Sequence, residues 1–142
     1  MSNDFVNYLS RQAAVGREKF GPGERRLGVI EHIKQELDEI NASETQEEVC
    51  VEWADVCILG MDGLLRAVRE GLRERLKDAG EGPNMMEGIL VAFSGEPTND
   101  YVAACAMNMI MGKQQKNELR DFGDWRGVPE DVAINHKAGD HD

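Results

Sequence analysis

Apolar residues recur every three or four positions along most of the chain, which is typical of helices with one buried face. A first stretch at residues 4–19 ends at the turn-forming sequence FGPG, residues 20–23. A second stretch begins at Glu24 and ends at residues 41–43, and its spacing predicts an amphipathic helix. The apolar stripe of this second helix consists of Val29, Ile30, Ile33, Leu37 and Ile40.

A long third helix is predicted to follow. Ser43, with Gln46 three positions later, is the expected N-terminal cap. The first half of this helix is apolar on more than one face, so we expect it to lie at the centre of a bundle. Beyond Arg66 the helix becomes highly charged, and this second half is expected to protrude into solvent. The Gly- and Pro-containing residues 78–83 end the helix.

A fourth helix is predicted to begin at Thr98 or Asn99 and to run to about Leu119. The short apolar stretch at residues 85–93 fits no element securely, and residues 121–142 form an irregular tail. Neither repeats nor low-complexity segments interrupt this order. The pattern therefore predicts one all-α domain, an antiparallel helical bundle, spanning residues 1–142.

The net charge of the chain limits which molecules it is expected to bind. The 142 residues include 27 acidic and 16 basic side chains, which gives a formal net charge of -11. Binding to a nucleic acid polymer depends on Lys and Arg contacts with phosphates, so such a partner is not expected. A nucleotide substrate remains compatible with the acidity, because carboxylates can hold a divalent cation that in turn faces phosphate.

The cysteines and the apolar stretches indicate the compartment. Cys50, Cys57 and Cys105 form no C-x-x-C pair and have no histidine at zinc-finger spacing, so we expect them to be reduced. The first residues lack the pattern of a signal peptide, and no apolar run approaches the roughly 18 residues of a membrane span. A cytoplasmic protein without a membrane partner is expected.

Two pairs of acidic residues form the main candidate for chemistry. Glu36 and Glu39 are three positions apart on the second helix, and Glu52 and Asp55 have the same spacing on the third. Each pair therefore lies on nearly one face of its helix. If the two helices pack antiparallel, as their short connection favours, four carboxylates converge and repel one another.

This repulsion can be relieved by protonation or by a bound cation. Mg²⁺ prefers oxygen ligands and would combine carboxylates from two helices with phosphate oxygens of a substrate. The alternative is that these acids are ordinary solvated helix faces, which are common in a chain with 30% charged residues. Spacing alone leaves both interpretations open.

Three separated blocks carry a family resemblance: FGPGERRLGVIEHIKQELDE at residues 20–39, EWADVCILGMDG at 52–63 and KQQKNELR at 113–120. They resemble the MazG-like dATP/dGTP pyrophosphohydrolases, an all-α, phage-type family of nucleoside triphosphate pyrophosphatases. The resemblance implies Mg²⁺-dependent hydrolysis of a purine deoxynucleoside triphosphate to the monophosphate and pyrophosphate, with Mn²⁺ as a possible substitute. It assigns the metal and the catalysis to Glu36, Glu39, Glu52 and Asp55.

Further site residues follow from the same resemblance. Phe20 is expected to stack on the base and Arg25 to contact phosphate, although the FGPG sequence alone indicates only a turn. The last block places basic and amide side chains on one helix face, where they would bind phosphate or simply complement the helix dipole. This basic block consists of Lys113, Lys116, Asn117 and Arg120.

The assembly and the exact substrate are less constrained. Members of such families are dimers or tetramers, so a homo-oligomer is expected, in a host cytoplasm if the protein is phage-encoded. Residues 66–97 form an apparent insertion relative to compact members, and Phe122 stands where the family usually has Trp. Two alternatives to the purine pyrophosphohydrolase remain. One is an all-α dUTP or dCTP pyrophosphatase, and the other is a noncatalytic helical module that binds a nucleotide or a protein.

Overall fold

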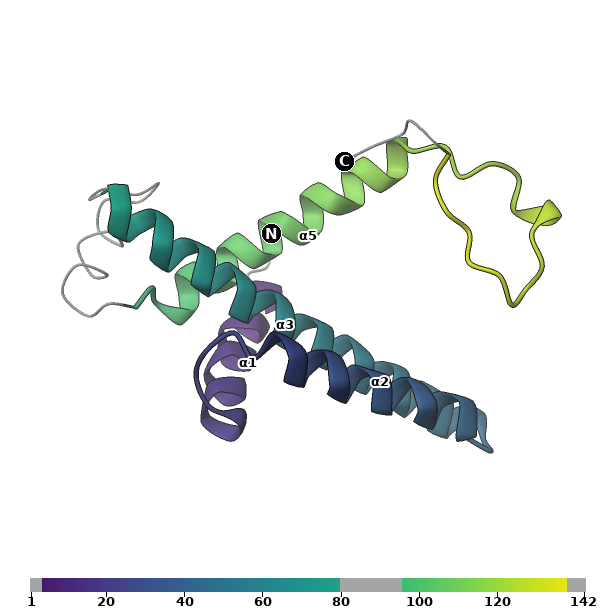
Figure 1. Ribbon diagram of the computed structural model, residues 1–142, viewed down its shortest axis with the longest axis horizontal. Coiled ribbons are helices and arrows are strands. Elements are labelled where there is room, and N and C mark those ends of the chain that lie inside the picture. Colours follow the sequence, from purple (N-terminus) through teal and green to yellow (C-terminus); the bar gives the residue numbers. More distant parts are fainter. Residues whose placement is uncertain (1–3, 80–95, 138–142) are drawn as a thin grey trace. The chain divides into compact units, whose positions relative to one another are not determined.

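The computed structural model describes residues 4–79 and 96–137, with side chains for 4–75 and 96–137. The predicted all-α class is confirmed, because the described residues contain helices and no strand (Figure 1). The apolar stretch at residues 85–93 lies outside the described residues. The elements are α1 (Asp4–Phe20), α2 (Arg26–Ala42), α3 (Gln46–Ala79), α5 (Asn99–Leu119) and a short 3-10 helix η1 (Trp125–Gly127).

The turn between α2 and α3 differs from the expected cap. Thr45 Oγ1 accepts a hydrogen bond from the backbone N–H of Glu48, and the Glu48 carboxylate accepts one from the N–H of Thr45. This reciprocal pair is a capping box at the start of α3. The prediction of Ser43 as the cap was wrong, because the Ser43 hydroxyl instead donates to the carbonyl of Glu39 at the end of α2.

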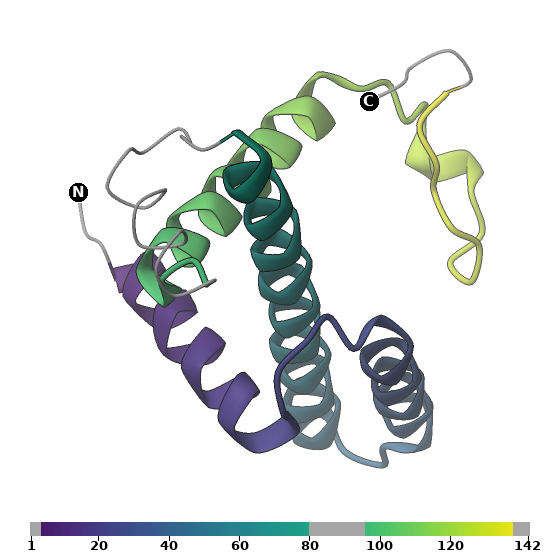
Figure 2. The ribbon, with the colours of Figure 1, turned by 60° about the vertical axis from the view of Figure 1, so that its left-hand side comes forward.

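The chain divides into two units, residues 1–107 and 108–142. In the first unit, α2 and the N-terminal half of α3 run side by side and antiparallel, with α1 packed against α3 farther along (Figures 1 and 2). α5 begins in this unit, where Thr98 Oγ1 accepts a hydrogen bond from the N–H of Tyr101 and caps the helix. Of the two predicted caps for α5, Thr98 is the one observed.

The core of the first unit forms where α1, α3 and the start of α5 meet. Seven buried apolar residues from these three helices form one cluster. Their small members allow the helix backbones to approach closely, while the leucines fill the space between them. The seven residues are Leu9, Ala13, Leu65, Leu72, Val102, Ala103 and Ala106.

The two halves of α3 differ from the prediction. One face of the second half is buried, where Arg66 and Arg69 are each only 5% exposed and Leu72 is 2% exposed. In the first half, Val51 and Ile58 remain 54% and 41% exposed, because only α2 packs there. The charged residues of the second half misled the prediction, since two of its arginines are buried by pairing with carbonyls and carboxylates.

Arg66 holds the α1–α2 connection against α3. Its guanidinium donates to the carboxylate of Asp62 at 2.8 Å and to the backbone carbonyls of Gly16, Gly21 and Gly23 at 2.8–2.9 Å. Asp62 is itself 5% exposed, so the pair is buried together. One side chain thus binds two carbonyls of the connection and one carbonyl of α1.

α1 comes close to α3 at Gly16. A Cβ atom placed on this residue would collide with the buried carboxylate of Asp62. Glycine is therefore required here for steric reasons, because any side chain would displace the carboxylate from Arg66.

The second unit contains the end of α5 and an irregular segment, as predicted for the tail, apart from the single turn of η1. Asp121 and Lys137 close this segment: the Lys137 N–H donates to the Asp121 carbonyl at 2.8 Å, and their side chains form an ion pair at 3.0 Å. The ring of Phe122 contacts that of His136 edge to face.

In the part of the chain that the structure describes, no helix has both the length and the apolar character that a bilayer span needs.

Breaking the Asp62–Arg66 pair should destabilise the fold strongly. Arg66→Met leaves a buried carboxylate and three carbonyls without their donor, so we expect a loss of about 3–5 kcal/mol in the free energy of unfolding. Urea denaturation followed by circular dichroism measures it. Asp62→Leu combined with Arg66→Met should recover part of this loss. Arg75→Met, at an exposed site of the same helix, should stay within about 0.5 kcal/mol; an equal effect at both sites would contradict the assigned role.

Candidate active site

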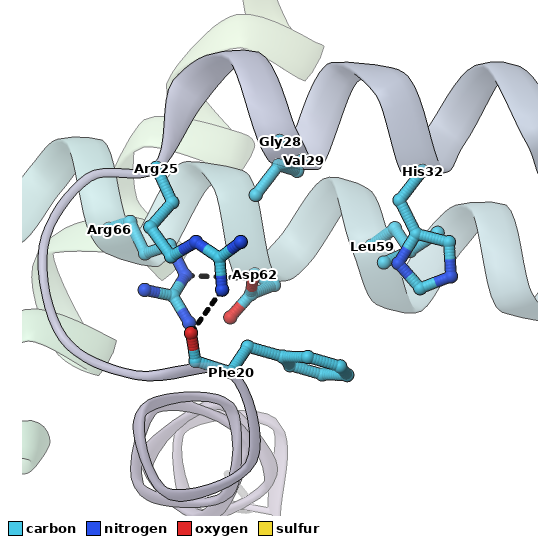
Figure 3. Close-up of a pocket in the computed structure, with 8 residues that line it drawn as sticks. All are labelled: Phe20, Arg25, Gly28, Val29, His32, Leu59, Asp62 and Arg66. Carbon is cyan, nitrogen blue, oxygen red and sulfur yellow. Dashed lines mark hydrogen bonds and ion pairs between the residues drawn. The ribbon is translucent and has the colours of Figure 1, made fainter.

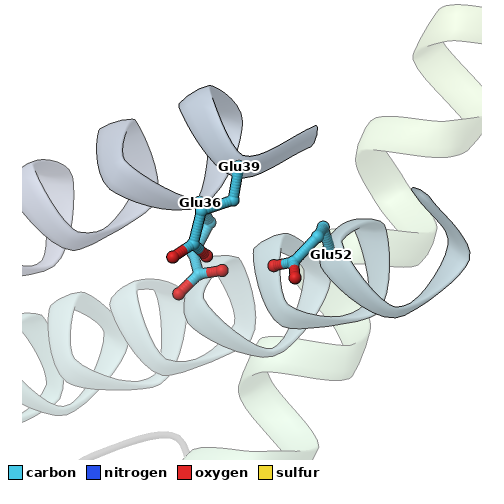
Figure 4. Close-up of side chains that lie close together, drawn as sticks. All are labelled: Glu36, Glu39 and Glu52. Atoms are coloured by element: carbon cyan, nitrogen blue, oxygen red, sulfur yellow. The ribbon is translucent and has the colours of Figure 1, made fainter. Parts of the chain in front are cut away.

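Three carboxylates meet between α2 and α3. Glu36 and Glu39 extend from the last turns of α2, and Glu52 extends from the second turn of α3 toward them (Figure 4). One oxygen atom from each lies within 4.8 Å of the others. The antiparallel packing of the two helices produces this proximity, because it places the end of one beside the start of the other. We call these residues the acid cluster.

Two oxygens of the acid cluster are in an unfavourable environment for free carboxylates. Glu36 Oε2 and Glu52 Oε2 are shielded from solvent, and neither accepts a hydrogen bond from the described residues. A buried anionic oxygen without a donor is costly, and groups of this kind are usually satisfied by a ligand, an ion or a proton. Oxygen atoms from three acids at this spacing are suitable ligands for a hard divalent cation.

The acid cluster also changes the proton affinity of Glu36. Its pKa is raised from 4.5 to about 7, chiefly because the protonated side chain can hydrogen bond to Glu39 and then to Glu52. Partial burial and the negative charges of Glu39 and Asp55 add to the increase. The raised pKa of Glu36 is what repulsion between converging carboxylates should produce. Binding of a proton or a cation would reduce this repulsion.

Asp55 has a different position from the one expected. The structure does not include it among the mutually close oxygens, although its charge acts on Glu36. Of the four predicted acids, three are brought together and the fourth lies within electrostatic reach.

A small hollow of about 40 Å³ lies along the same helix pair (Figure 3). Its walls combine two rings, apolar side chains, two guanidinium groups and one carboxylate. It connects with the acid cluster through His32, whose Nε2 lies 3.5 Å from Glu36 Oε1. The residues that line the hollow are Phe20, Arg25, Gly28, Val29, His32, Leu59, Asp62 and Arg66.

Arg25 has an unusual backbone in this hollow. It precedes α2 with φ at 51°, in the left-handed region that non-glycine residues seldom adopt. Its guanidinium turns back and donates to the carbonyl of Phe20. The sequence prediction placed Phe20 and Arg25 near a nucleotide, and the structure places both on the wall of this hollow, on the same helix pair as the acid cluster.

The hollow and the acid cluster lie on the same helix faces. On α2, His32 and Glu36 are four residues apart, which keeps them on one side. On α3, Glu52, Leu59 and Arg66 repeat at seven-residue intervals. The acid cluster and the hollow, which contains two guanidinium groups, thus lie along the same side of the helix pair.

The basic block belongs to the second unit. Lys113, Lys116 and Asn117 lie in α5, and Arg120 follows its last residue and donates to Asn117 Oδ1 at 2.8 Å. The binding of phosphate by this block stays a prediction.

Sequence reasoning missed two residues that shape the hollow, Asp62 and Arg66. Their spacing of four residues within an otherwise apolar stretch was a signal, because a buried helix face tolerates opposite charges only when they pair. The three carbonyls that Arg66 binds had no signal in the sequence.

Comparison with known families gives one match. A family model described as dATP/dGTP pyrophosphohydrolase matches residues 8–79, about half of the chain. The chain belongs to this family. The match confirms the resemblance and includes α2, the acid cluster and the hollow, whereas the basic block lies outside it. Searches of curated proteins and of solved structures give no match.

Without divalent cations, stability should depend on the charge of Glu36. Its pKa is higher in the folded protein than the ordinary 4.5, so the folded state binds the extra proton. Raising the pH from 4.5 through 7 removes that proton and should lower the melting temperature. Thermal melts in EDTA across this range measure the effect.

Glu36→Gln is the matched control, because it keeps the shape of the side chain and cannot ionise. It should weaken the fall in melting temperature with rising pH, and addition of Mg²⁺ at pH 8 should stabilise the wild type more than the variant. Identical pH profiles for the two proteins would contradict the convergence of the acids.

Proposed function

We propose that the protein hydrolyses dATP or dGTP to the monophosphate and pyrophosphate in a Mg²⁺-dependent reaction at the acid cluster. The observation that carries this proposal is the pair of buried, unpartnered oxygens on Glu36 and Glu52 beside Glu39. The family of the chain supports the same reaction. Mn²⁺ has similar ligand preferences and would substitute.

In this reaction a water oxygen forms a bond to the α-phosphorus, and the bond from that phosphorus to the bridging oxygen of the β-phosphate breaks. Pyrophosphate leaves, and a carboxylate of Glu36 or Glu39 orients the water and accepts its proton. Bound Mg²⁺ supplies positive charge that offsets both the carboxylates and the phosphates. Glu36, Glu39, Glu52 and Asp55 would hold it.

Two residues that line the hollow would contact the substrate. Phe20 offers a ring for stacking, and Arg25 offers a guanidinium that can reach phosphate oxygens. The basic block, Lys113, Lys116, Asn117 and Arg120, would bind phosphate in its own unit. These assignments rest on chemistry, because a planar ring can stack on a base and a cation can bind phosphate.

Turnover tests the proposal. We expect pyrophosphate release from dATP or dGTP with Mg²⁺ and none in EDTA. Glu52→Gln removes a metal ligand and should reduce kcat/KM at least about 100-fold. Glu47→Gln changes an exposed acid five residues earlier on α3 and should leave the rate unchanged.

Both variants should keep the helical circular dichroism of the wild type. Preferential release from dUTP or dCTP would replace the purine assignment, and binding of nucleotides without any turnover would indicate a noncatalytic module. Full activity of Glu52→Gln would exclude the acid cluster as the catalytic site.

Self-association is the second part of the proposal. Ile30 and Leu37 on α2, and Val51 and Ile58 on α3, are each seven residues apart and 40–54% exposed. Seven residues return a helix to the same side, so each helix presents an exposed apolar stripe. A second copy of the chain would cover these stripes in a homo-oligomer.

Placing a charge in one stripe should dissociate this assembly. Ile58→Glu introduces a carboxylate that would be buried without a partner at the interface, so we expect a smaller species in analytical ultracentrifugation. Gln35→Glu adds the same charge at another exposed position and serves as the control. A monomeric wild type would contradict the assembly.

A further inference from the structure

His32 stands between the hollow and the acid cluster. It is four residues before Glu36 on α2, and its Nε2 lies 3.5 Å from Glu36 Oε1. On its other side, the ring meets that of Phe20 edge to face, with 6.2 Å between the ring centroids. The family-derived site assignment gives this residue no role, yet it both lines the hollow and lies beside the acid cluster.

We propose that His32, supported by Phe20, is a positioning residue that orients Glu36 for binding a divalent cation. The inference rests on the proposed function, because it concerns the metal of that site. It requires only a neutral imidazole with its proton on Nε2, where it faces a carboxylate oxygen.

The two oxygens of Glu36 support this role. Oε1 faces His32, whereas Oε2 is buried and has no donor among the described residues. A glutamate side chain has several rotatable bonds, and contact with an imidazole at one oxygen restricts them. The other oxygen is then held ready for a cation, and the entropy cost of binding falls.

Phe20 explains why the imidazole keeps its orientation. His32 is 41% exposed, so burial alone does not fix its ring. The edge-to-face contact with Phe20 restricts it, and Phe20 is itself the last residue of α1, next to the connection that Arg66 binds. Arg66 thus binds the loop that follows Phe20, Phe20 contacts His32, and His32 lies beside Glu36.

Mn²⁺ binding to the nucleotide-free protein tests the inference without reference to turnover. Electron paramagnetic resonance measures free Mn²⁺ during a titration of the full chain. We expect His32→Ala to weaken binding about 10–100-fold, which is typical for loss of a group that orients a metal ligand. His32→Gln, which retains an N–H donor of similar reach, should recover most of the affinity.

Two further variants locate the effect. Phe20→Ala should weaken Mn²⁺ binding less than His32→Ala, because it frees the ring without removing the donor. Gln35→Ala, an exposed neighbour on α2, should bind as the wild type does. Metal-free melting temperatures of all variants should lie close together, since His32 contributes little buried surface.

Several outcomes would overturn the inference. Wild-type Mn²⁺ affinity in His32→Ala, accompanied by a change in nucleotide KM, would make His32 a base contact while the proposed function stands. Equal weakening in His32→Ala and His32→Gln would exclude the donor role. Absence of Mn²⁺ binding in the wild type, together with absence of turnover, would remove the proposed function as well.

Discussion

Electrostatic repulsion between carboxylates held on two helices is the constraint on which the site depends. Packing of α2 against α3 brings Glu36, Glu39 and Glu52 together, and nothing in the described structure donates to their buried oxygens. The raised pKa of Glu36 reports the same conflict. A fold that needed these positions only for stability would gain by placing neutral residues there, so the arrangement is best explained by a ligand of positive charge.

The rest of the first unit keeps this arrangement in place. The apolar core lies on the C-terminal half of α3, away from the acid cluster, and anchors that helix to α1 and α5. Arg66 then fixes the α1–α2 connection through carbonyls of three glycines. This connection carries Phe20 and sets where α2 begins. The apolar core and the acid cluster thus occupy different halves of one long helix, which allows the acids to remain mutually repulsive without unfolding the protein.

The sequence predicted local features well and three-dimensional partners poorly. Helix positions followed from periodicity, and the pairs of acids followed from spacing on helices with a short connection. The burial of Arg66 and Arg69 went unpredicted, because charge normally indicates solvent and their carbonyl partners lie far along the chain. The one signal was the spacing of Arg66 from Asp62. The cap at Thr45 was missed because Ser43 offered an equally good local pattern. Asp55 was predicted to join Glu52 in the cluster because the two residues are three positions apart. This spacing fixes only the helix face on which Asp55 lies, and its side chain is shorter than that of a glutamate.

The most direct measurement is a crystal structure of the protein with Mn²⁺ and a dGTP analogue that resists cleavage at the α-phosphorus, with the metal located by anomalous scattering. We expect an anomalous peak within bonding distance, about 2–2.5 Å, of oxygens from Glu36, Glu39 and Glu52, adjacent to the triphosphate. A peak elsewhere, or a bound nucleotide with no metal between it and these acids, would contradict this expectation.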